Sequence, residues 1–410
     1  MEVKLAYGRT SVTLDVPDWV EMDRYGRSDV NDRVAYSDFC TGLSMAKAEV
    51  VFRGSPLFVV NDGHRSTPTL KVLDWLNQYD STLLDRASFL IACGAHCAPT
   101  DEQLQTIFGP YFDRARDRLF WHDCHDLDSM VSVGVDHFGE QVYLNRLVVE
   151  SEQSIVITSV EPHYFAGFTG GRKSYFPGLT DMSTIERNHN LANSLDCAPL
   201  KLKGNPMAEH LDEILALIEP ERIFSIQLVM DASHNISRVF FGSIDTAFRE
   251  ATDAARNLYA YKVDQPYDLA LAEVGSPLDR SLYQIQKALE NCQAAVVDGG
   301  TAVVVAACED GIGKRNFYDL ASEWDAEENV PIDRVPRFGS HKLSRVNTIR
   351  RRINVRLYSD LPPEQPRRVF YEPAKDLQVL VNECLDRDNR KRLAIVYDAG
   401  HTVLQTIGAP

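Results

Sequence analysis

One pattern constrains the fold more than any other: an apolar run, a short polar loop and a helix start recur in this order three times in the first half of the chain. The apolar runs are residues 56–60, 89–94 and 154–160. The first helix is predicted to open at Thr67 and Pro68, and the next two at capping boxes that begin at Thr100 and Ser183. This repetition predicts an α/β fold with largely parallel strands, in which ligands bind beyond the carboxyl ends of the strands.

The same order of strand, loop and helix recurs in the second half of the chain, after a break at residues 264–266. Before the break we expect a helix at about 205–218, a β-hairpin around 232–235 and a helix over 246–261. After it we expect strands at 268–274, 294–300, 301–308 and 392–399 and a helix over 281–292. The segment 323–367 is rich in charge and proline, so we expect it to be irregular or surface-lying. The 410 residues fit two domains, 1–265 and 266–410, each with a largely parallel sheet flanked by helices and with the active site in the cleft between them.

Charge and composition exclude several functional classes. The chain carries 59 acidic against 43 basic residues, a formal net charge of −16, which is the opposite of a nucleic-acid-binding protein. It contains no apolar stretch of the ~18–20 residues that a membrane span needs, and its first residues alternate like a strand. The eight cysteines have no paired framework, which favours reduced thiols. We therefore expect a cytoplasmic small-molecule enzyme without a membrane or nucleic-acid partner.

The third loop, residues 161–173, is the segment of the chain richest in candidate functional residues. It combines one histidine and three glycines with adjacent cations, and Gly170, Gly171, Arg172 and Lys173 are candidates to bind an anionic cofactor. A tight structural loop with solvated cations is the simpler alternative. Because Arg172 stands where a Walker A loop needs glycine, an ordinary P-loop ATPase is disfavoured. The chain also lacks GxGxxG between a strand and a helix, which argues against a classical NAD dehydrogenase.

Three histidines are candidates for catalysis or metal binding. His96 and His163 each follow a predicted strand, so they could face each other as acid and base. His189 lies six residues past Ser183, in the predicted second turn of a helix whose positive end favours the neutral, metal-binding imidazole. A structural or solvent-facing role is the alternative for His189.

Other polar groups are weaker candidates. Asp62 and Arg65 could form a local ion pair or a clamp for ribose or carboxylate. Gln284 and Lys287 share one helix face beside Tyr283, which is either solvated or directed into the interdomain cleft. The cluster at 122–125 contains histidines and a cysteine, but its spacing is too tight for a usual zinc site.

Together, the segments DGHR (62–65), GAH (94–96), EPHYFAGFTGGRKSYFPG (161–178) and LYQIQK (282–287), with His189, resemble the nickel-pincer lactate racemase family of 2-hydroxyacid racemases and epimerases. The likeness covers most of the chain in the same order, and the 161–178 segment is its most specific part. It implies a nickel-pincer nucleotide, pyridinium-3,5-bisthiocarboxylic acid mononucleotide nickel. By this resemblance Lys173 forms the covalent thioamide to the cofactor, His189 ligates nickel and Asp62 helps to seat the nucleotide.

The resemblance also implies how substrate is held and turned over. His96 and His163 match the two acid–base histidines, and the positions that hold substrate or the cofactor edge are Arg65, Tyr283, Gln284 and Lys287. Hydride leaves the substrate carbon to give a flat 2-keto acid, which is reduced again on its other face. The implied partners are a small 2-hydroxy acid and the cofactor-synthesis enzymes; the oligomeric state stays open.

Two positions depart from the family pattern. His64 stands where a threonine commonly precedes the arginine, and Cys97 where an arginine often follows the histidine. Both lie near the expected substrate, so a 2-hydroxy acid larger or more polar than lactate is equally compatible. The alternatives are a nicotinamide-type dehydrogenase or a zinc enzyme that uses the same histidines, and a nucleotide- or metal-binding homologue without catalysis.

Overall fold

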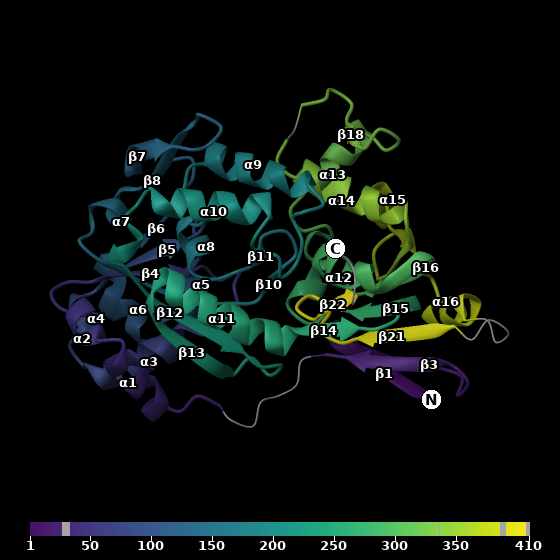
Figure 1. The fold of residues 1–410 in the computed structure, drawn as a ribbon, viewed down its shortest axis with the longest axis horizontal. Helices are drawn as coiled ribbons and strands as arrows, with labels where there is room; N and C mark the ends of the chain where they lie inside the picture. Colours follow the sequence, from purple (N-terminus) through teal and green to yellow (C-terminus); the bar gives the residue numbers. More distant parts are fainter. Residues whose placement is uncertain (27–32, 336, 386–390, 407–410) are drawn as a thin grey trace.

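The chain is organised around two six-stranded sheets in a computed structural model that describes residues 1–26, 33–335, 337–385 and 391–406 (Figure 1). The first sheet has the strand order β13-β12-β9-β4-β5-β6. Its strands are β4 (Leu57–Asn61), β5 (Ser88–Ala92), β6 (Leu119–Trp121), β9 (Ser154–Ser159), β12 (Ile223–Met230) and β13 (Ile236–Ser243). All neighbours are parallel except β12 and β13, which form the predicted hairpin.

The second sheet is parallel at every pairing of its described strands, in the order β20-β19-β16-β15-β21-β3. Its strands are β3 (Glu21–Tyr25), β15 (Tyr267–Glu273), β16 (Val296–Val305), β19 (Asn354–Tyr358), β20 (Glu372–Pro373) and β21 (Arg392–Val396). Parallel strands need crossover connections, which the intervening helices supply. The predicted α/β class with two largely parallel sheets is confirmed.

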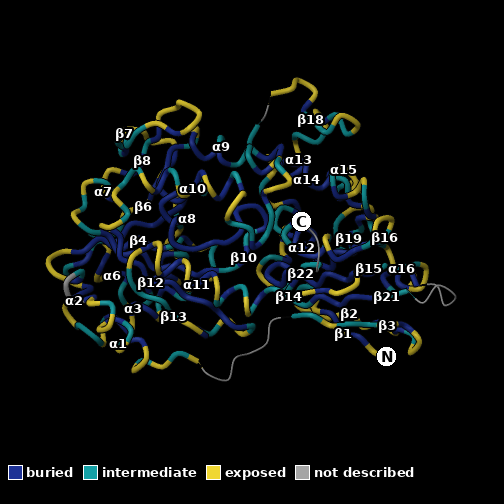
Figure 2. The backbone as a smooth tube through the Cα atoms, viewed as in Figure 1, coloured by how far each residue is buried: buried dark blue, intermediate teal, exposed yellow. Residues whose placement is uncertain are grey.

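Helices cover both faces of the first sheet, so its four central strands, β12, β9, β4 and β5, are buried (Figure 2). One face packs on α1 (Tyr36–Met45), α3 (Thr69–Tyr79) and α5 (Asp101–Phe108). The other packs on α8 (Arg172–Tyr175), α9 (Met182–Asn190) and α10 (Pro206–Ala216). A further helix, α11 (Ile244–Tyr259), packs on β12 and β13 and leads towards the second sheet. Successive side chains of β4 and β5 point to opposite faces of the sheet, so each of these strands contributes to both cores.

The second sheet is covered on one face by α12 (Leu282–Cys292) and α14 (Ser340–Arg350). Its other face packs on α16 (Leu377–Cys384) and on the hairpin of β1 (Glu2–Tyr7) and β2 (Thr10–Asp15). The N-terminal segment thus adds β3 to the second sheet and packs the β1–β2 hairpin against it, which the division into 1–265 and 266–410 did not anticipate. That division itself stays a prediction. No helix of the described ranges is long and apolar enough to cross a bilayer.

The segment 323–367, predicted to be irregular, instead contains α14, β19 and α15 (Glu364–Arg368). The prediction was wrong because α14 buries polar side chains that have partners rather than an apolar stripe. Arg345 pairs with buried Glu290 at 2.7 Å, and Lys342 Nζ donates to the Tyr283 carbonyl at 2.9 Å. The two strands predicted at 294–300 and 301–308 are one strand, β16, with a register shift where the glycines lie.

Two of the three predicted helix starts also differ. The Thr100 capping box is present, with its hydroxyl accepting the Gln103 N–H. Thr67 instead bonds to Asn61 and Ser159, and α3 begins at Thr69. The cap of α9 is Asp181, whose carboxylate accepts the Thr184 N–H at 2.9 Å, so Ser183 is already inside the helix.

Candidate active site

A cavity that is open to solvent at its mouth lies at the carboxyl ends of β4, β5 and β9. We call the part of the chain built around the first sheet the first lobe and the part built around the second sheet the second lobe. Residues of the first lobe that line the cavity come from the loops after these strands and from α9. Those of the second lobe come from the start of α12 and include Lys314 and Phe338. The cavity therefore brings together residues that are more than 200 positions apart in the sequence.

His96 lies in the loop after β5, where its ring is held by Asp62. The distance between His96 Nδ1 and Asp62 Oδ2 is 2.5 Å. Although burial opposes it, His96 holds the pKa of the Asp62 carboxyl below its usual value, so Asp62 is an ionised acceptor. Burial lowers the pKa of His96 despite that carboxylate. His96 is therefore a neutral imidazole with a carboxylate behind it, the arrangement of a general base.

His163 belongs to the two-residue strand β10 (Pro162–His163), which pairs with β11 (Gly167–Phe168) in a tight turn. Its Nδ1 accepts the backbone N–H groups of Phe165 at 3.2 Å and Ala166 at 3.0 Å. Burial and the nearby cations, Lys173 foremost, hold the pKa of His163 well below its usual range. His163 is thus neutral as well, but its Nδ1 faces two backbone N–H donors, whereas Nδ1 of His96 faces a carboxylate.

His189 lies in the last turn of α9, near its C-terminus, and not in a second turn near a positive end. The helix-dipole reasoning for its neutral state was therefore wrong, since α9 begins at Met182 and is short. Burial lowers the pKa of His189 to about 4. Its Nδ1 donates to the Ile185 carbonyl at 2.8 Å, which leaves the Nε2 lone pair for a ligand. Metal-binding histidines commonly donate their other N–H to a backbone carbonyl in this way.

Lys173 reaches the cavity from α8, directly after the glycines of the third loop. Burial, reinforced by Arg65, Arg172 and Lys287, holds the pKa of its amine well below the usual range. Among the described residues its Nζ has no hydrogen-bond or ion-pair partner. An amine without its proton is a nucleophile, so Lys173 suits a covalent attachment.

Arg65, Lys287 and Lys314 add cationic character to the cavity lining. Burial lowers the pKa of Lys287 to about 8, and it also lowers the pKa of Lys314. Tyr283 and Gln284 line the same wall as Lys287, as the shared helix face predicted. The local charge is therefore positive although the chain as a whole is acidic, which suits an anionic cofactor and a carboxylate substrate.

Two of the predicted cofactor-binding residues do not line the cavity. Arg172 is only 2% exposed; its guanidinium pairs with Asp212, donates to the Ala208 carbonyl at 3.1 Å and stacks on Phe248. Gly171 packs against Gln227, where a Cβ would lie 2.5 Å from the amide nitrogen. Both hold the loop in place. Gly170 does line the cavity, with a φ of +103° that disfavours other residues.

Several residues of the site had no predicted role. Lys314 comes from the loop after β16, and its Nζ donates to the Ala95 carbonyl at 3.4 Å. Glu161 is paired with His401 at 2.8 Å, and the His64 ring contacts that of His96 at a tilt of 60°, with ring centroids 4.4 Å apart. The GxGK pattern at 311–314 was the one available signal for Lys314. The cluster at 122–125 is not a metal site, because His122 donates to the Thr180 carbonyl while His125 is exposed.

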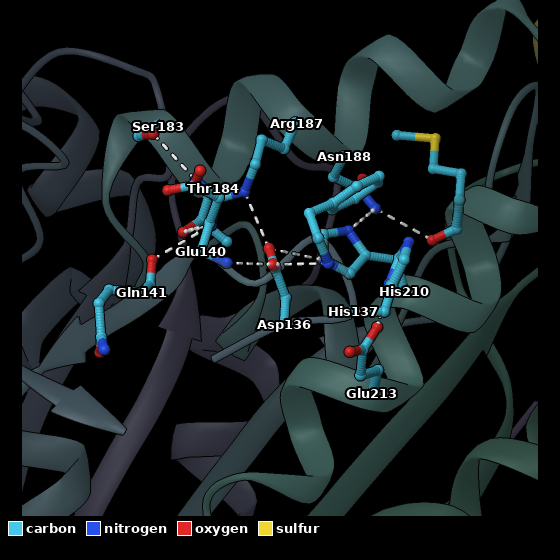
Figure 3. A network of polar contacts seen from close by, with 12 residues as sticks. Asp136, His137, Glu140, Gln141, Ser183, Thr184, Arg187, Asn188, His210 and Glu213 are labelled. Carbon is cyan, nitrogen blue, oxygen red and sulfur yellow. Dashed lines mark hydrogen bonds and ion pairs between the residues drawn. The ribbon is translucent and has the colours of Figure 1, made fainter. Parts of the chain in front are cut away.

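A buried polar network outside the cavity fixes α9, the helix that carries His189 (Figure 3). Asp136 accepts from Arg187 Nε at 2.8 Å and lies 3.4 Å from His210 Nε2. Asn188, next to His189, donates to the Met207 carbonyl at 3.1 Å and contacts His210 Nδ1 at 3.3 Å. Together these contacts join α9 to α10 and to the turn after β7 (Met130–Val135).

Comparison with known proteins places this architecture in a family. Family models described as the lactate racemase N-terminal domain and C-terminal domain match residues 44–197 and 264–342. The lactate racemase of Lactiplantibacillus plantarum is 30% identical over 297 residues, 71% of this chain and 68% of its own. That of Thermoanaerobacterium thermosaccharolyticum is 27% identical over 348 residues, 81% of this chain and 79% of its own.

Solved structures share the fold. The lactate racemase apoprotein from T. thermosaccharolyticum has a TM-score of 0.86 at 21% identity, covering 99% of this chain and all of that one. A protein from Thermotoga maritima has a TM-score of 0.70 at 17% identity, covering 93% of this chain and all of that one. Fold and cavity define a two-lobed α/β protein with its site between the lobes. The chain belongs to the lactate racemase family, and its enzyme class is that of a racemase, an isomerase.

Proposed function

We propose that this protein racemises or epimerises 2-hydroxy acids, either lactate or a larger one, with a nickel-pincer nucleotide attached through Lys173. The observation that carries the proposal is one cavity with a nucleophilic lysine, a neutral histidine with a free Nε2, and two more histidines. The relatives that are named lactate racemases support the same reaction class. Enzymes that synthesise the cofactor, in the cytoplasm, would supply it to the chain.

The residues present fit this group. Lys173 is an amine of lowered pKa without a partner among the described residues, as an amide-type tether requires, and His189 offers one lone pair to a metal. Asp62 and Gly170 line the same cavity and would help to seat the nucleotide, beside cations that match its negative charge. When bound, the group would supply an electron-poor carbon that accepts hydride from C2 of the substrate.

The protein's own part is to bind and orient the substrate and to move its hydroxyl proton. Arg65 and Lys287 are the proposed partners of the carboxylate, and Tyr283 and Gln284 would complete that wall. His96 and His163 are the proposed acid–base pair at the hydroxyl group. Loss of hydride and proton leaves a flat 2-keto acid, and its reduction on the other face inverts the centre.

Racemisation of a C2-deuterated hydroxy acid in ordinary water tests this mechanism. Return of the same hydride predicts that both enantiomers keep deuterium, whereas removal of the carbon proton by a base would wash it out into solvent. A nicotinamide-type dehydrogenase would instead release keto acid and NADH in equal amounts. Unchanged optical rotation for every D- or L-2-hydroxy acid, with protein loaded by the cofactor-synthesis enzymes, would overturn the proposal.

A further inference from the structure

A charged bridge joins the two lobes at the cavity wall, and His401 is its centre. Nε2 of His401 lies 2.8 Å from Oε2 of Glu161, a residue of the first lobe that lines the cavity. Nδ1 of His401 lies 2.9 Å from Oδ1 of Asp398, in the loop after β21 of the second lobe. Asn291 donates to two backbone carbonyls of this loop, at 2.9 Å and 3.0 Å. The helix α12, which carries both Asn291 and Lys287, therefore holds the loop of His401 in place.

His401 carries a positive charge in this arrangement. A carboxylate can only accept hydrogen bonds, so each ring nitrogen of His401 must donate one, and an imidazole that donates from both nitrogens is protonated. Although burial opposes it, Asp398 and Glu161 raise the pKa of His401 to about 9. The side chain is buried, so solvent screens the pair with Glu161 little. The bridge therefore sets a buried cation against the Glu161 carboxylate.

Glu161 is the acidic group that could oppose the cations of the cavity. Asp62 and Glu161 are the two acidic residues among the described residues that line the cavity, and Asp62 is paired with His96. Burial lowers the pKa of Lys287, and Glu161 acts in the opposite direction, so the charges of Glu161 and Lys287 attract each other. Within the described part of the chain, the Lys287 amine has no hydrogen bond or ion pair. A Glu161 carboxylate that lost His401 would therefore turn to Lys287.

Such a pair would weaken substrate binding, because Lys287 is one of the two proposed partners of the substrate carboxylate. A carboxylate on the same chain competes at an effective concentration on the order of millimolar. In the structure both oxygens of Glu161 have other partners. Oε2 is paired with His401, and Oε1 accepts from the Ser159 hydroxyl at 3.3 Å.

We propose, resting on the function proposed above, that His401 is a positioning residue for substrate binding: it holds the Glu161 carboxylate and so leaves Lys287 available to the substrate carboxylate. His401 is not among the residues that line the cavity, so it acts on binding and leaves the chemical step to other residues. It also lies outside the two segments that match the family models, 44–197 and 264–342.

Racemisation kinetics of the cofactor-loaded enzyme test this role. His401→Gln removes the charge and keeps a hydrogen-bonding side chain. We expect KM for the 2-hydroxy acid to rise about tenfold, as for loss of one charge-assisted contact, while kcat stays close to that of the wild type. In the double variant that adds Glu161→Gln the competing carboxylate is gone, so KM should return towards the wild-type value. A KM that does not rise in His401→Gln, or that stays as high in the double variant, would overturn the inference.

Glu161→Gln alone is the matched variant, because it removes the carboxylate and keeps His401 beside Asp398. It should not raise KM, and a tenfold rise would contradict the proposed role. Adduct mass and nickel content of each variant establish equal cofactor loading, and thermal unfolding followed by circular dichroism establishes that each variant is folded.

The pKa of Lys287 can be measured in the unloaded full-length protein, without turnover. Competitive acetylation over a series of pH values, followed by peptide mass spectrometry, gives this pKa. We expect it to rise in His401→Gln and to fall back in the double variant with Glu161→Gln, because the freed carboxylate pairs with Lys287. An unchanged pKa of Lys287 in His401→Gln would overturn the inference. A wild-type enzyme that racemises nothing refutes the proposed function, while this titration still decides whether His401 keeps Glu161 from Lys287.

Discussion

Replacing Asp62 with asparagine removes the charge that supports His96 while nearly preserving shape. Asp62 Oδ2 lies 2.5 Å from His96 Nδ1, and 6% of the Asp62 side chain is exposed, so solvent screens the pair little. A hydrogen bond to a charged group contributes about 1.5–3 kcal/mol, and about 1.4 kcal/mol corresponds to a tenfold change in rate. Asp62 stabilises His96 when the imidazole takes the proton, so loss of this hydrogen bond to a charged group lowers kcat about 10- to 150-fold in Asp62→Asn.

The pH dependence of the same variant has a definite sign. Burial lowers the pKa of His96, and Asp62 opposes that effect. Without the carboxylate the pKa falls further, so His96 stays unprotonated to lower pH. The acidic limb of kcat/KM therefore moves to lower pH while the plateau falls, because a weaker base takes the proton less readily.

Initial rates from chiral chromatography, measured from acidic to neutral pH on cofactor-loaded protein, give both quantities. Adduct mass and nickel content show whether the variant still binds cofactor. Asp113→Asn is the matched control, because Asp113 is exposed and, within the part of the chain that the structure describes, its ion-pair partner is the surface residue Arg116. An Asp62→Asn enzyme with the wild-type rate and pH profile would refute the reasoning that His96 is the base.

Three further substitutions test other parts of the site. In His189→Ala we expect the covalent adduct on Lys173 to persist while nickel is lost, as intact mass and metal analysis would show; retained nickel would exclude His189 as the ligand. Lys314→Met should raise KM for an anionic substrate about tenfold, as expected for loss of one charge-assisted contact, and Lys314→Arg should restore it; equal KM values would remove Lys314 from the substrate site. Asp136→Asn leaves Arg187 unpaired and should lower the free energy of unfolding by about 3 kcal/mol in urea titrations. Although burial opposes it, the Glu140 backbone N–H and Arg187 lower the pKa of Asp136. The difference in unfolding free energy should therefore be full at neutral pH and shrink as acid protonates the wild-type carboxyl; a constant difference would contradict it.

Much of the fold could be predicted because its central strands are continuous apolar runs followed by turn residues. Buried parallel strands such as β4, β9 and β15 have this pattern, and each was predicted within about two residues. The position of α14 could not be predicted in this way. It buries Lys342 and Arg345, whose partners lie on the distant helix α12, so the helix has no apolar periodicity of its own.

The site was predictable to the extent that its residues follow strand ends in the first sheet. His96 and His163 lie there, and parallel strands bring their carboxyl ends to one edge. Arg172 was misplaced because sequence shows a charge and not its direction; the guanidinium turns to Asp212 and Phe248 instead. Lys314 was missed because only the packing of the two lobes brings its loop to the cavity.

The central claim is that the chain is a 2-hydroxyacid racemase with a cofactor tethered to Lys173. Intact-protein mass spectrometry with nickel analysis, on wild type and Lys173→Ala made alongside the cofactor-synthesis enzymes, tests it most directly. The account predicts a mass increase, bound nickel and racemisation in the wild type, and no adduct or racemisation in the variant. Wild-type protein of unmodified mass, without nickel and inactive on every D- or L-2-hydroxy acid, would contradict it.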